Sequence, residues 1–139
     1  MARSMMESCS LSLTSNPGEI ELLLETLDTI LEKSKLDELP AFGFRCAVIE
    51  VVNNCIRHAY KDEPGHPINI TIQLQPDHLT LVVKDRGPAF TGPVGTPQSD
   101  PLAESGRGFE IINAGVSKVN FGHQDGWNSC RLEVHITLG

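Results

Sequence analysis

The stretch INITIQLQPDHLTLVVKD, residues 68–85, decides the fold of this chain. In its first half, isoleucine and leucine alternate strictly with polar residues, which predicts a strand with one buried and one solvated face. Residues 76–78 then turn the chain into a second strand, Leu79 to Asp85. A hairpin whose strands are apolar on one side predicts an antiparallel-rich sheet with helices over its single apolar face.

The sequence on either side of this hairpin supplies those helices and the remaining strands. Upstream, the predicted elements are a strand over Ser8–Thr14, a helix from Ile20 to about Lys35 and a helix from about Leu39 to about Tyr60. Downstream of an aperiodic Gly/Pro-rich stretch, Gly87–Gly108, they are a short helix and strands over Val116–Phe121 and Cys130–Leu138. We therefore predict a two-layer α/β (α+β) sandwich with a mixed, mostly antiparallel sheet, formed by one domain over residues 1–139.

Composition places the chain among ordinary globular proteins. Its apolar fraction is 40% and its charged fraction is 21%, which argues against disorder. The formal net charge of −7 disfavours direct nucleic-acid binding, because phosphate contacts require clustered Lys and Arg. Any bound nucleotide must therefore be held by backbone amides, a metal ion or a few local donors.

Cysteine spacing and the apolar runs bear on the cellular compartment. The four cysteines form no CxxC pair and have no histidine at zinc-finger spacing, so we expect free, buried thiols. The N-terminus lacks an apolar core of signal-peptide length, and no segment approaches a membrane span. These features predict a cytoplasmic protein without membrane contact.

The second predicted helix is apolar around most of its circumference but carries one polar stripe. Glu50, Asn54 and His58 follow one another at i, i+4 spacing and share a face. The stripe is either a solvent-exposed edge or one wall of a ligand groove, because an unpaired buried carboxylate is costly. In a groove, Glu50 would supply a base or order a water, and Asn54 an oxygen for a cation such as Mg²⁺. His58 taken alone fits a hydrogen bond at the helix end.

Two glycine-containing segments are further candidates for ligand contact. Alternation puts Asp85 on the helix-facing side of its strand, where the carboxylate needs a donor such as an adenine amine. Gly87 would leave room for a planar ligand, although a plain strand-end turn is the alternative. Gly106 and Gly108 begin the short helix, where backbone N–H groups and the helix dipole favour a phosphate. The chain has no GxxxxGK[ST] motif, so a Walker-type phosphate loop is excluded.

Three segments, taken in order, resemble the motifs of GHKL ATPases. Residues 50–60, EVVNNCIRHAY, resemble the asparagine box ExxxNxxxHA(Y). Residues 85–90, DRGPAF, resemble the glycine box DxGxxF, and residues 106–112, GRGFEII, resemble the box GxGxxII. The likeness covers nearly the whole chain and implies the Bergerat fold of that superfamily. Within it, the chain is most similar to the small RsbW-type anti-sigma-factor serine kinases, because its asparagine box ends in His-Ala-Tyr and its lid is short and contains prolines.

The resemblance implies a role for each matching residue. Asn54 would ligate a Mg²⁺ that bridges the ATP phosphates, and Glu50 would be the catalytic residue that deprotonates a serine hydroxyl of a protein substrate. Asp85 would accept a hydrogen bond from the adenine amine with Gly87 beneath the base, and residues 88–105 would form a flexible ATP lid. Further nucleotide-binding residues implied by the likeness are His58, Gly106, Arg107, Gly108, Phe109, Asn128 and Ser129.

One position departs from the family pattern. The family often has Thr near the start of its last strand to support the adenine site, whereas residues 126–129 read GWNS here. Alternation with Cys130 and Leu132 favours Asn128 as the inward residue and leaves Ser129 as the second choice.

The resemblance also implies a function and partners. It implies an ATP- and Mg²⁺-dependent serine/threonine protein kinase that acts as an anti-sigma factor in a partner-switching system. Its substrate would be a STAS-type anti-sigma-factor antagonist, a sigma factor would be a second partner, and a homodimer is implied by likeness alone. The alternative is an ATP-dependent protein-binding switch with little or no kinase activity. A third hypothesis is a sandwich of this fold that has lost nucleotide binding.

Overall fold

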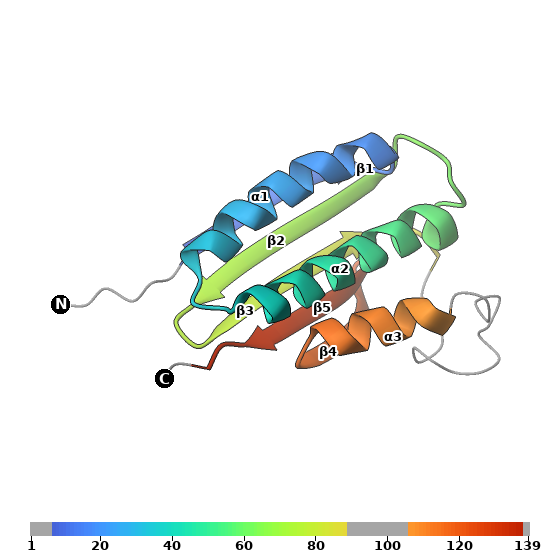
Figure 1. The fold of residues 1–139 in the computed structure, drawn as a ribbon. Coiled ribbons are helices and arrows are strands. Elements are labelled where there is room, and N and C mark those ends of the chain that lie inside the picture. The colour runs from blue at the N-terminus through green and yellow to red at the C-terminus, as the bar shows by residue number, and fades with distance from the viewer. Residues whose placement is uncertain (1–6, 89–105, 138–139) are drawn as a thin grey trace.

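A five-stranded sheet forms one layer of the molecule in this computed structural model, which describes residues 7–88 and 106–137 (Figure 1). The strand order is β1-β2-β3-β5-β4, and every strand pair in the described residues is antiparallel, so the sheet is more uniform than the mixed sheet that we predicted. The strands are β1 (Glu7–Thr14), β2 (Pro67–Gln75), β3 (His78–Asp85), β4 (Lys118–Gln124) and β5 (Trp127–His135).

The helices form the second layer and cover one face of the sheet (Figure 1). A single 3-10 turn, η1 (Pro17–Glu19), leads into the first helix. The α-helices are α1 (Ile20–Lys33), α2 (Glu38–Asn54) and α3 (Gly106–Gly115). This arrangement confirms the predicted two-layer sandwich.

The core lies between the two layers and follows the predicted alternation. The strands are aligned so that Ile70 lies opposite Val83, and Val83 lies opposite Cys130. A slip by one residue would turn this apolar set toward solvent, so burial fixes the register. The buried apolar side chains of β2, β3 and β5 are Ile68, Ile70, Ile72, Leu74, Leu79, Leu81, Val83, Cys130, Leu132 and Val134. The helices contribute Leu23, Leu27, Ile30, Phe44, Ala47, Val48, Val51 and Val52.

The last two strands differ from their predicted bounds because they form a tight hairpin. Gln124 pairs with Trp127, and the two residues between them, Asp125 and Gly126, have φ angles of 55° and 83°. Positive φ at both positions of a two-residue loop is the type I′ geometry that Asp-Gly favours. Strand β5 therefore begins three residues before Cys130, our predicted start, and β4 extends beyond its predicted end at Phe121.

The long helix changes geometry before it ends. Residues Cys55–Ala59 form a π-helical turn, η2, in which the Tyr60 N–H donates to the Cys55 carbonyl at 3.0 Å. We predicted a regular helix to about Tyr60, because apolar residues continue there and periodicity does not separate a π turn from an α-helix. Turns of this kind are rare and often lie at functional sites.

The helical run Glu38–Ala59 also corrects our expectation that no segment approaches a membrane span. By length and composition alone, these 22 residues could cross a membrane, because an 18-residue window within them has a mean hydropathy of 1.3. In the fold, however, its side chains Phe44, Val48 and Val52 are fully buried in the sandwich core. A core helix passes the same test of length and composition.

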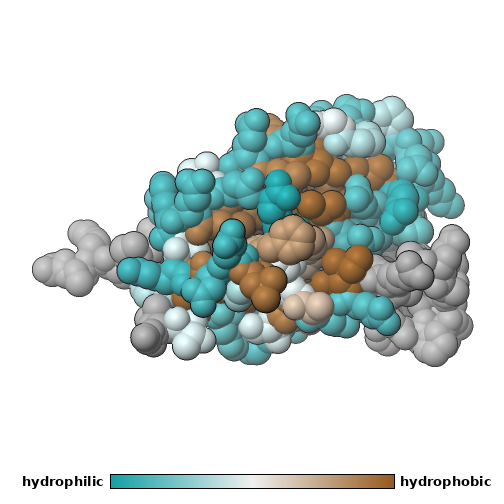
Figure 2. Space-filling view, in the orientation of Figure 1, coloured by the Kyte–Doolittle hydropathy of each residue, from teal (hydrophilic) through white to brown (hydrophobic). Residues whose placement is uncertain are grey.

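The outer surface of the helical layer keeps some apolar side chains. Figure 2 shows hydrophobic groups reaching the surface among hydrophilic ones on this face. Leu39 at the start of α2 is 79% exposed and Phe42, one turn later, is 60% exposed. These two side chains contribute nothing to the core, which explains why the start of α2 has an irregular apolar pattern.

Candidate functional site

Asp85, the last residue of β3, is the buried carboxylate at the centre of the candidate site. Only 8% of it is exposed, and its side chain faces the helices as alternation predicts. One carboxylate oxygen, Oδ1, accepts from the Gly87 N–H and from Asn128 Nδ2, both at 2.9 Å. The other, Oδ2, accepts from the Cys55 thiol at 3.3 Å. A carboxylate has about four acceptor positions, so three donors leave roughly one position free, on Oδ2.

Asn128 holds this carboxylate from the neighbouring strand. It lies opposite Asp85 in the β3–β5 register and is 8% exposed, so it is the inward residue of the GWNS segment, as alternation favours. Its Nδ2 atom also lies 3.1 Å from the Gly87 carbonyl and 3.0 Å from the Pro88 carbonyl. Its side chain thereby joins β5 to the chain that leaves β3.

Ser129, the second choice for this role, lies elsewhere. It pairs with exposed Lys84 and with Gly122, so its side chain is on the opposite face of the sheet from Asp85. The structure therefore does not bring Ser129 together with the other candidate residues on the helix-covered face.

Gly87 is required by a close approach to the π-helical turn. A Cβ atom at this position would lie 2.6 Å from the Cβ atom and 2.9 Å from the carbonyl oxygen of Ala59. We predicted that the missing side chain leaves room for a planar ligand. The contact shows a different physical reason for glycine, because the chain after β3 packs directly on the end of η2.

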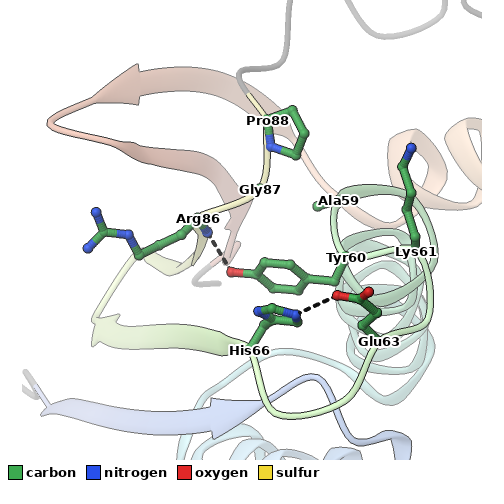
Figure 3. Close-up of a pocket in the computed structure, with 8 residues that line it drawn as sticks. All are labelled: Ala59, Tyr60, Lys61, Glu63, His66, Arg86, Gly87 and Pro88. Atoms are coloured by element: carbon green, nitrogen blue, oxygen red, sulfur yellow. Dashed lines mark hydrogen bonds and ion pairs between the residues drawn. The ribbon is translucent and has the colours of Figure 1, made fainter.

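A pocket of about 260 Å³ opens beside this contact (Figure 3). Its wall includes the Tyr60 ring, which stacks on His66 with centroids 4.7 Å apart. The Tyr60 hydroxyl donates to the Pro67 carbonyl and accepts from the Arg86 N–H, both at 2.6 Å. Burial raises the pKa of Tyr60, so the phenol remains a neutral donor and acceptor. It links the end of η2 to the start of β2 and to the residue that follows β3. The pocket is lined by Ala59, Tyr60, Lys61, Glu63, His66, Arg86, Gly87 and Pro88.

The polar stripe of the second helix is half-buried. The Glu50 side chain is 19% exposed, and its Oε2 atom lies 3.7 Å from a guanidinium nitrogen of Arg57. Asn54, one α-helical turn later, is also half-buried, and we find no hydrogen bond from its side chain to another described residue. His58 lies in η2, where the spacing is no longer α-helical, and it is exposed. The stripe is therefore not a fully solvated edge at Glu50 and Asn54.

The first turn of α3 contains the Gly106–Gly108 segment. α3 packs antiparallel to α2, so its N-terminus lies at the end of α2 that carries Asn54 (Figure 1). At the opposite end, the two helices approach so closely that a Cβ atom on Gly115 would lie within van der Waals overlap of the Gly43 carbonyl. The predicted lid at residues 88–105 lies outside the described residues apart from Pro88, as do the side chains of Arg107 and Phe109.

The donor set bears on whether a divalent cation fits here. Within residues 7–88 and 106–137, no group of three or more His, Cys, Asp or Glu side chains could hold a metal. A cation at Asn54 would therefore be held by that amide oxygen together with ligand oxygens. Mg²⁺ keeps few protein ligands and binds mainly through water and substrate phosphates, so a single amide without a hydrogen-bond partner in the described chain fits it.

The family model described as a histidine kinase-like ATPase domain matches residues 13–134. The chain belongs to this family. It is similar to the serine-protein kinase RsbW of Oceanobacillus iheyensis, at 32% identity over 91 residues, covering 59% of this chain and 58% of that protein. It is also similar to the serine/threonine-protein kinase BtrW of Bordetella bronchiseptica, at 30% identity over 62% of this chain and 64% of that protein. The anti-sigma F factor of O. iheyensis matches at 29% identity over 78% of this chain and 75% of that protein.

Solved structures show the same fold. The crystal structure of RsbU and RsbW domains from Mycobacterium tuberculosis superposes with a TM-score of 0.69 at 18% identity, covering 96% of this chain and 33% of that one. The histidine kinase AdeS of Acinetobacter baumannii superposes with a TM-score of 0.52 at 13% identity over 94% of this chain and 68% of that one. These structures confirm the predicted fold, and the relatives named above confirm the predicted likeness to RsbW in sequence.

Two residues of this histidine kinase-like ATPase domain were not among our predicted site residues. Cys55 donates to Asp85, and Tyr60 fixes the end of η2. The sequence pattern did not distinguish Cys55 from the apolar core residues beside it, because a thiol within an apolar helix usually behaves as a small core residue. Its position directly after Asn54 was the signal available.

Proposed function

We propose that this chain binds ATP and acts as a serine/threonine protein kinase and anti-sigma factor. The observation that carries the proposal is the Asp85 carboxylate, buried and held by three donors at the end of β3 in a histidine kinase-like ATPase domain. The names of the similar proteins, serine-protein kinase RsbW and anti-sigma F factor, support the activity and the role.

In this proposal, Asp85 accepts a hydrogen bond from the exocyclic amine of adenine through the free position on Oδ2. The backbone N–H groups at the start of α3 would contact the phosphates, because a helix N-terminus favours anions, and Arg107 is proposed as a further phosphate contact. Asn54 offers its amide oxygen to Mg²⁺, which would neutralise phosphate charge during transfer. Residues 88–105 would close over the nucleotide as a lid.

Glu50 is our candidate for the general base. Its half-buried carboxylate lies one turn before Asn54 on the same face of α2, so a substrate serine would have to approach that face. The carboxylate would take the proton of the serine hydroxyl as the oxygen attacks the γ-phosphate of ATP, and the bond that joins this phosphate to ADP would break, releasing ADP. The other site residues would orient the reactants and neutralise phosphate charge, which are the protein's main contributions to phosphoryl transfer.

We further propose that the protein substrate is a STAS-type anti-sigma-factor antagonist and that a sigma factor is the alternative partner. The two would exchange on the same protein according to its nucleotide, in the cytoplasm and with a homodimer as the acting species. The name of one relative, anti-sigma F factor, motivates the sigma-factor part.

One contact favours the second candidate, an ATP-dependent binding switch with little kinase activity. The guanidinium of Arg57 lies 3.7 Å from Glu50 Oε2, so one carboxylate oxygen faces a cation instead of an incoming hydroxyl. A switch requires ATP binding and a partner but no general base.

The first experiment is calorimetry with ATP and ADP, each with and without Mg²⁺. The expected result is Mg²⁺-dependent binding of both nucleotides and a rise in thermal unfolding temperature with nucleotide concentration. No heat and no stabilisation at millimolar nucleotide would rule out both candidate functions. Capture of partners from native lysate with ATP or ADP, followed by transfer of labelled γ-phosphate to the captured protein, then separates kinase from switch.

A further inference from the structure

The hydrogen bonds around Asp85 form a connected cluster that spans four elements, β3, η2, β5 and β4. Cys55 of η2 and Asn128 of β5 each donate to a different oxygen of the carboxylate. His123 of β4 then contacts Asn128, with 2.9 Å between His123 Nδ1 and Asn128 Oδ1. Asn128 Nδ2 faces the Asp85 carboxylate and two carbonyl oxygens, which are all acceptors, so the amide oxygen Oδ1 is the atom that faces His123. His123 donates to it when its proton is on Nδ1.

Cys55 is a donor that cannot easily be replaced by water. The residue is buried, and its thiol lies 3.3 Å from Asp85 Oδ2 with no intervening group. Burial, followed by the charge of Asp85, raises the pKa of the Cys55 thiol well above its usual range. The sulfur therefore keeps its proton and remains a donor at neutral pH.

Asn128 restrains both the carboxylate and the backbone that follows it. Its Nδ2 atom lies within 3.1 Å of the Gly87 and Pro88 carbonyl oxygens as well as Asp85 Oδ1. The Gly87 N–H occupies the second position on the same oxygen. Oδ1 is therefore fully occupied by donors, and only Oδ2 can receive a ligand donor.

We propose that Cys55 and Asn128 are positioning residues that hold the Asp85 carboxylate in one orientation, so that the site selects a 6-aminopurine over a 6-oxopurine nucleotide. This inference rests on the nucleotide binding proposed above. A free position on Oδ2 accepts from an amine but opposes a carbonyl oxygen, because both would be acceptors. A carboxylate that can rotate presents this acceptor to the amine for only part of the time, so the affinity for the 6-aminopurine falls and the selectivity weakens.

The matched pair for Cys55 is Cys55→Ala and Cys55→Ser. Alanine removes the donor, whereas serine keeps a hydroxyl donor of similar size. For Cys55→Ala, the affinity for ADP should fall by roughly threefold to tenfold while that for GDP changes little, because only the adenine amine uses the oriented oxygen. Cys55→Ser should retain the parent ratio of ADP to GDP affinity.

Two further variants separate orientation from packing. Asn128→Leu keeps side-chain volume but removes the amide, so the ratio of ADP to GDP affinity should fall as it does for Cys55→Ala. Cys130→Ala removes a second buried thiol from the same core, at a position opposite Val83. In the described part of the chain, the Cys130 thiol makes no hydrogen bond to Asp85. This control should lose stability but keep the parent ratio.

The experiment is calorimetry of the full chain with Mg²⁺-ADP and Mg²⁺-GDP, with thermal unfolding of each variant measured beside it. A lowered ratio in Cys55→Ala and Asn128→Leu, with the parent ratio in Cys55→Ser and Cys130→Ala, supports the assignment. If the parent binds ADP and the ratio is unchanged in either donor-less variant that folds, the positioning role is overturned while nucleotide binding stands. If the parent binds neither nucleotide, the positioning role and the proposed function both fail.

Discussion

At the scale of single residues, Glu50 and Asn54 offer a separation of phosphate transfer from nucleotide binding. Glu50→Gln keeps volume and hydrogen-bonding capacity but removes the basic carboxylate. Transfer to the protein substrate should fall by roughly two to four orders of magnitude, with ADP affinity near that of the parent. Asn54→Ala should instead abolish the Mg²⁺ dependence of ADP affinity. Single-turnover transfer from labelled ATP and calorimetry measure the two effects.

Arg57→Gln is the control for this comparison. It removes the cation beside Glu50 but leaves the carboxylate in place, so it should keep most of the transfer activity. Transfer at the parent rate by Glu50→Gln would reduce Glu50 to a structural residue, whereas no transfer by the parent protein itself would favour the binding switch.

Gly87→Ala tests the contact between the end of β3 and the π-helical turn. The added methyl would meet the Cβ, carbonyl oxygen and Cα atoms of Ala59 at 2.6, 2.9 and 3.0 Å. Two of these are backbone atoms that cannot rotate away, so the free energy of unfolding should fall by about 1–3 kcal/mol. Urea denaturation measures it. Adding Ala59→Gly removes only one of the three atoms, so the double variant should recover part of the loss; strict additivity would contradict the contact.

Residue orientation was predictable only where alternation applies. Asp85 and Asn128 were placed on the inner face because strand side chains have a period of two, and the structure agrees. Cys55 was not predicted, because its role depends on a strand thirty residues away in sequence. A single helix offers no periodic signal for such a contact.

At the scale of elements, the pairing of α2 with α3 depends on two glycines. A Cβ atom on Gly115 would overlap the Gly43 carbonyl oxygen and lie 2.6 Å from its carbon, so α3 would have to move off α2. Overpacking typically costs about 1–3 kcal/mol, whereas alanine gains at most about 1 kcal/mol from helix propensity. Gly115→Ala should therefore lower the free energy of unfolding and weaken ADP binding, since α3 carries the Gly106–Gly108 turn.

Gly18→Ala is the matched control for that substitution. No atom lies within 4 Å of a Cβ built on Gly18, and its φ is not positive. Denaturation midpoints of the two variants, measured side by side, should differ clearly. A Gly115→Ala variant as stable as Gly18→Ala would contradict the close helix packing.

Element types followed from the sequence more closely than element ends did. The β2–β3 hairpin and both long helices lie where their periodicity indicated. The β4–β5 turn was missed although Asp125-Gly126 is a strong hairpin signal, because we placed more weight on the alternation after Cys130. The π turn could not be predicted, since the Gly87–Ala59 and Tyr60–Arg86 contacts that accompany it are tertiary.

At the scale of the whole molecule, buried thiols and a buried phenol determine how stability responds to alkali. Burial raises the pKa of Cys130 from an ordinary 9.0 to about 12 and raises that of Cys55 and Tyr60 as well. The unfolded chain therefore releases these protons first. Their contribution to the free energy of unfolding is fully present below pH 9. It is lost as the pH rises toward the pKa values of the folded state, at up to about 1.4 kcal/mol per pH unit for each thiol.

Urea denaturation between pH 7 and pH 10.5, under reducing conditions, measures this loss. The free energy of unfolding should stay level to about pH 8.5 and then decline. Cys130→Ala should have a lower free energy at neutral pH but a shallower alkaline decline. An equal decline in the parent and this variant would show that Cys130 does not carry the effect.

The strand register also separates the two ends of the described chain from the candidate site. Glu7 pairs with Leu74, so β1, the first strand in sequence, starts beside the β2–β3 turn. His135 pairs with His78, so β5, the last strand in sequence, ends beside the same turn. Asp85 and Asn128 lie at the far end of the same strands, roughly 23 Å away at about 3.3 Å per residue. A polypeptide segment joined before Glu7 or after His135 would therefore leave the sheet at the end opposite Asp85 and Asn128.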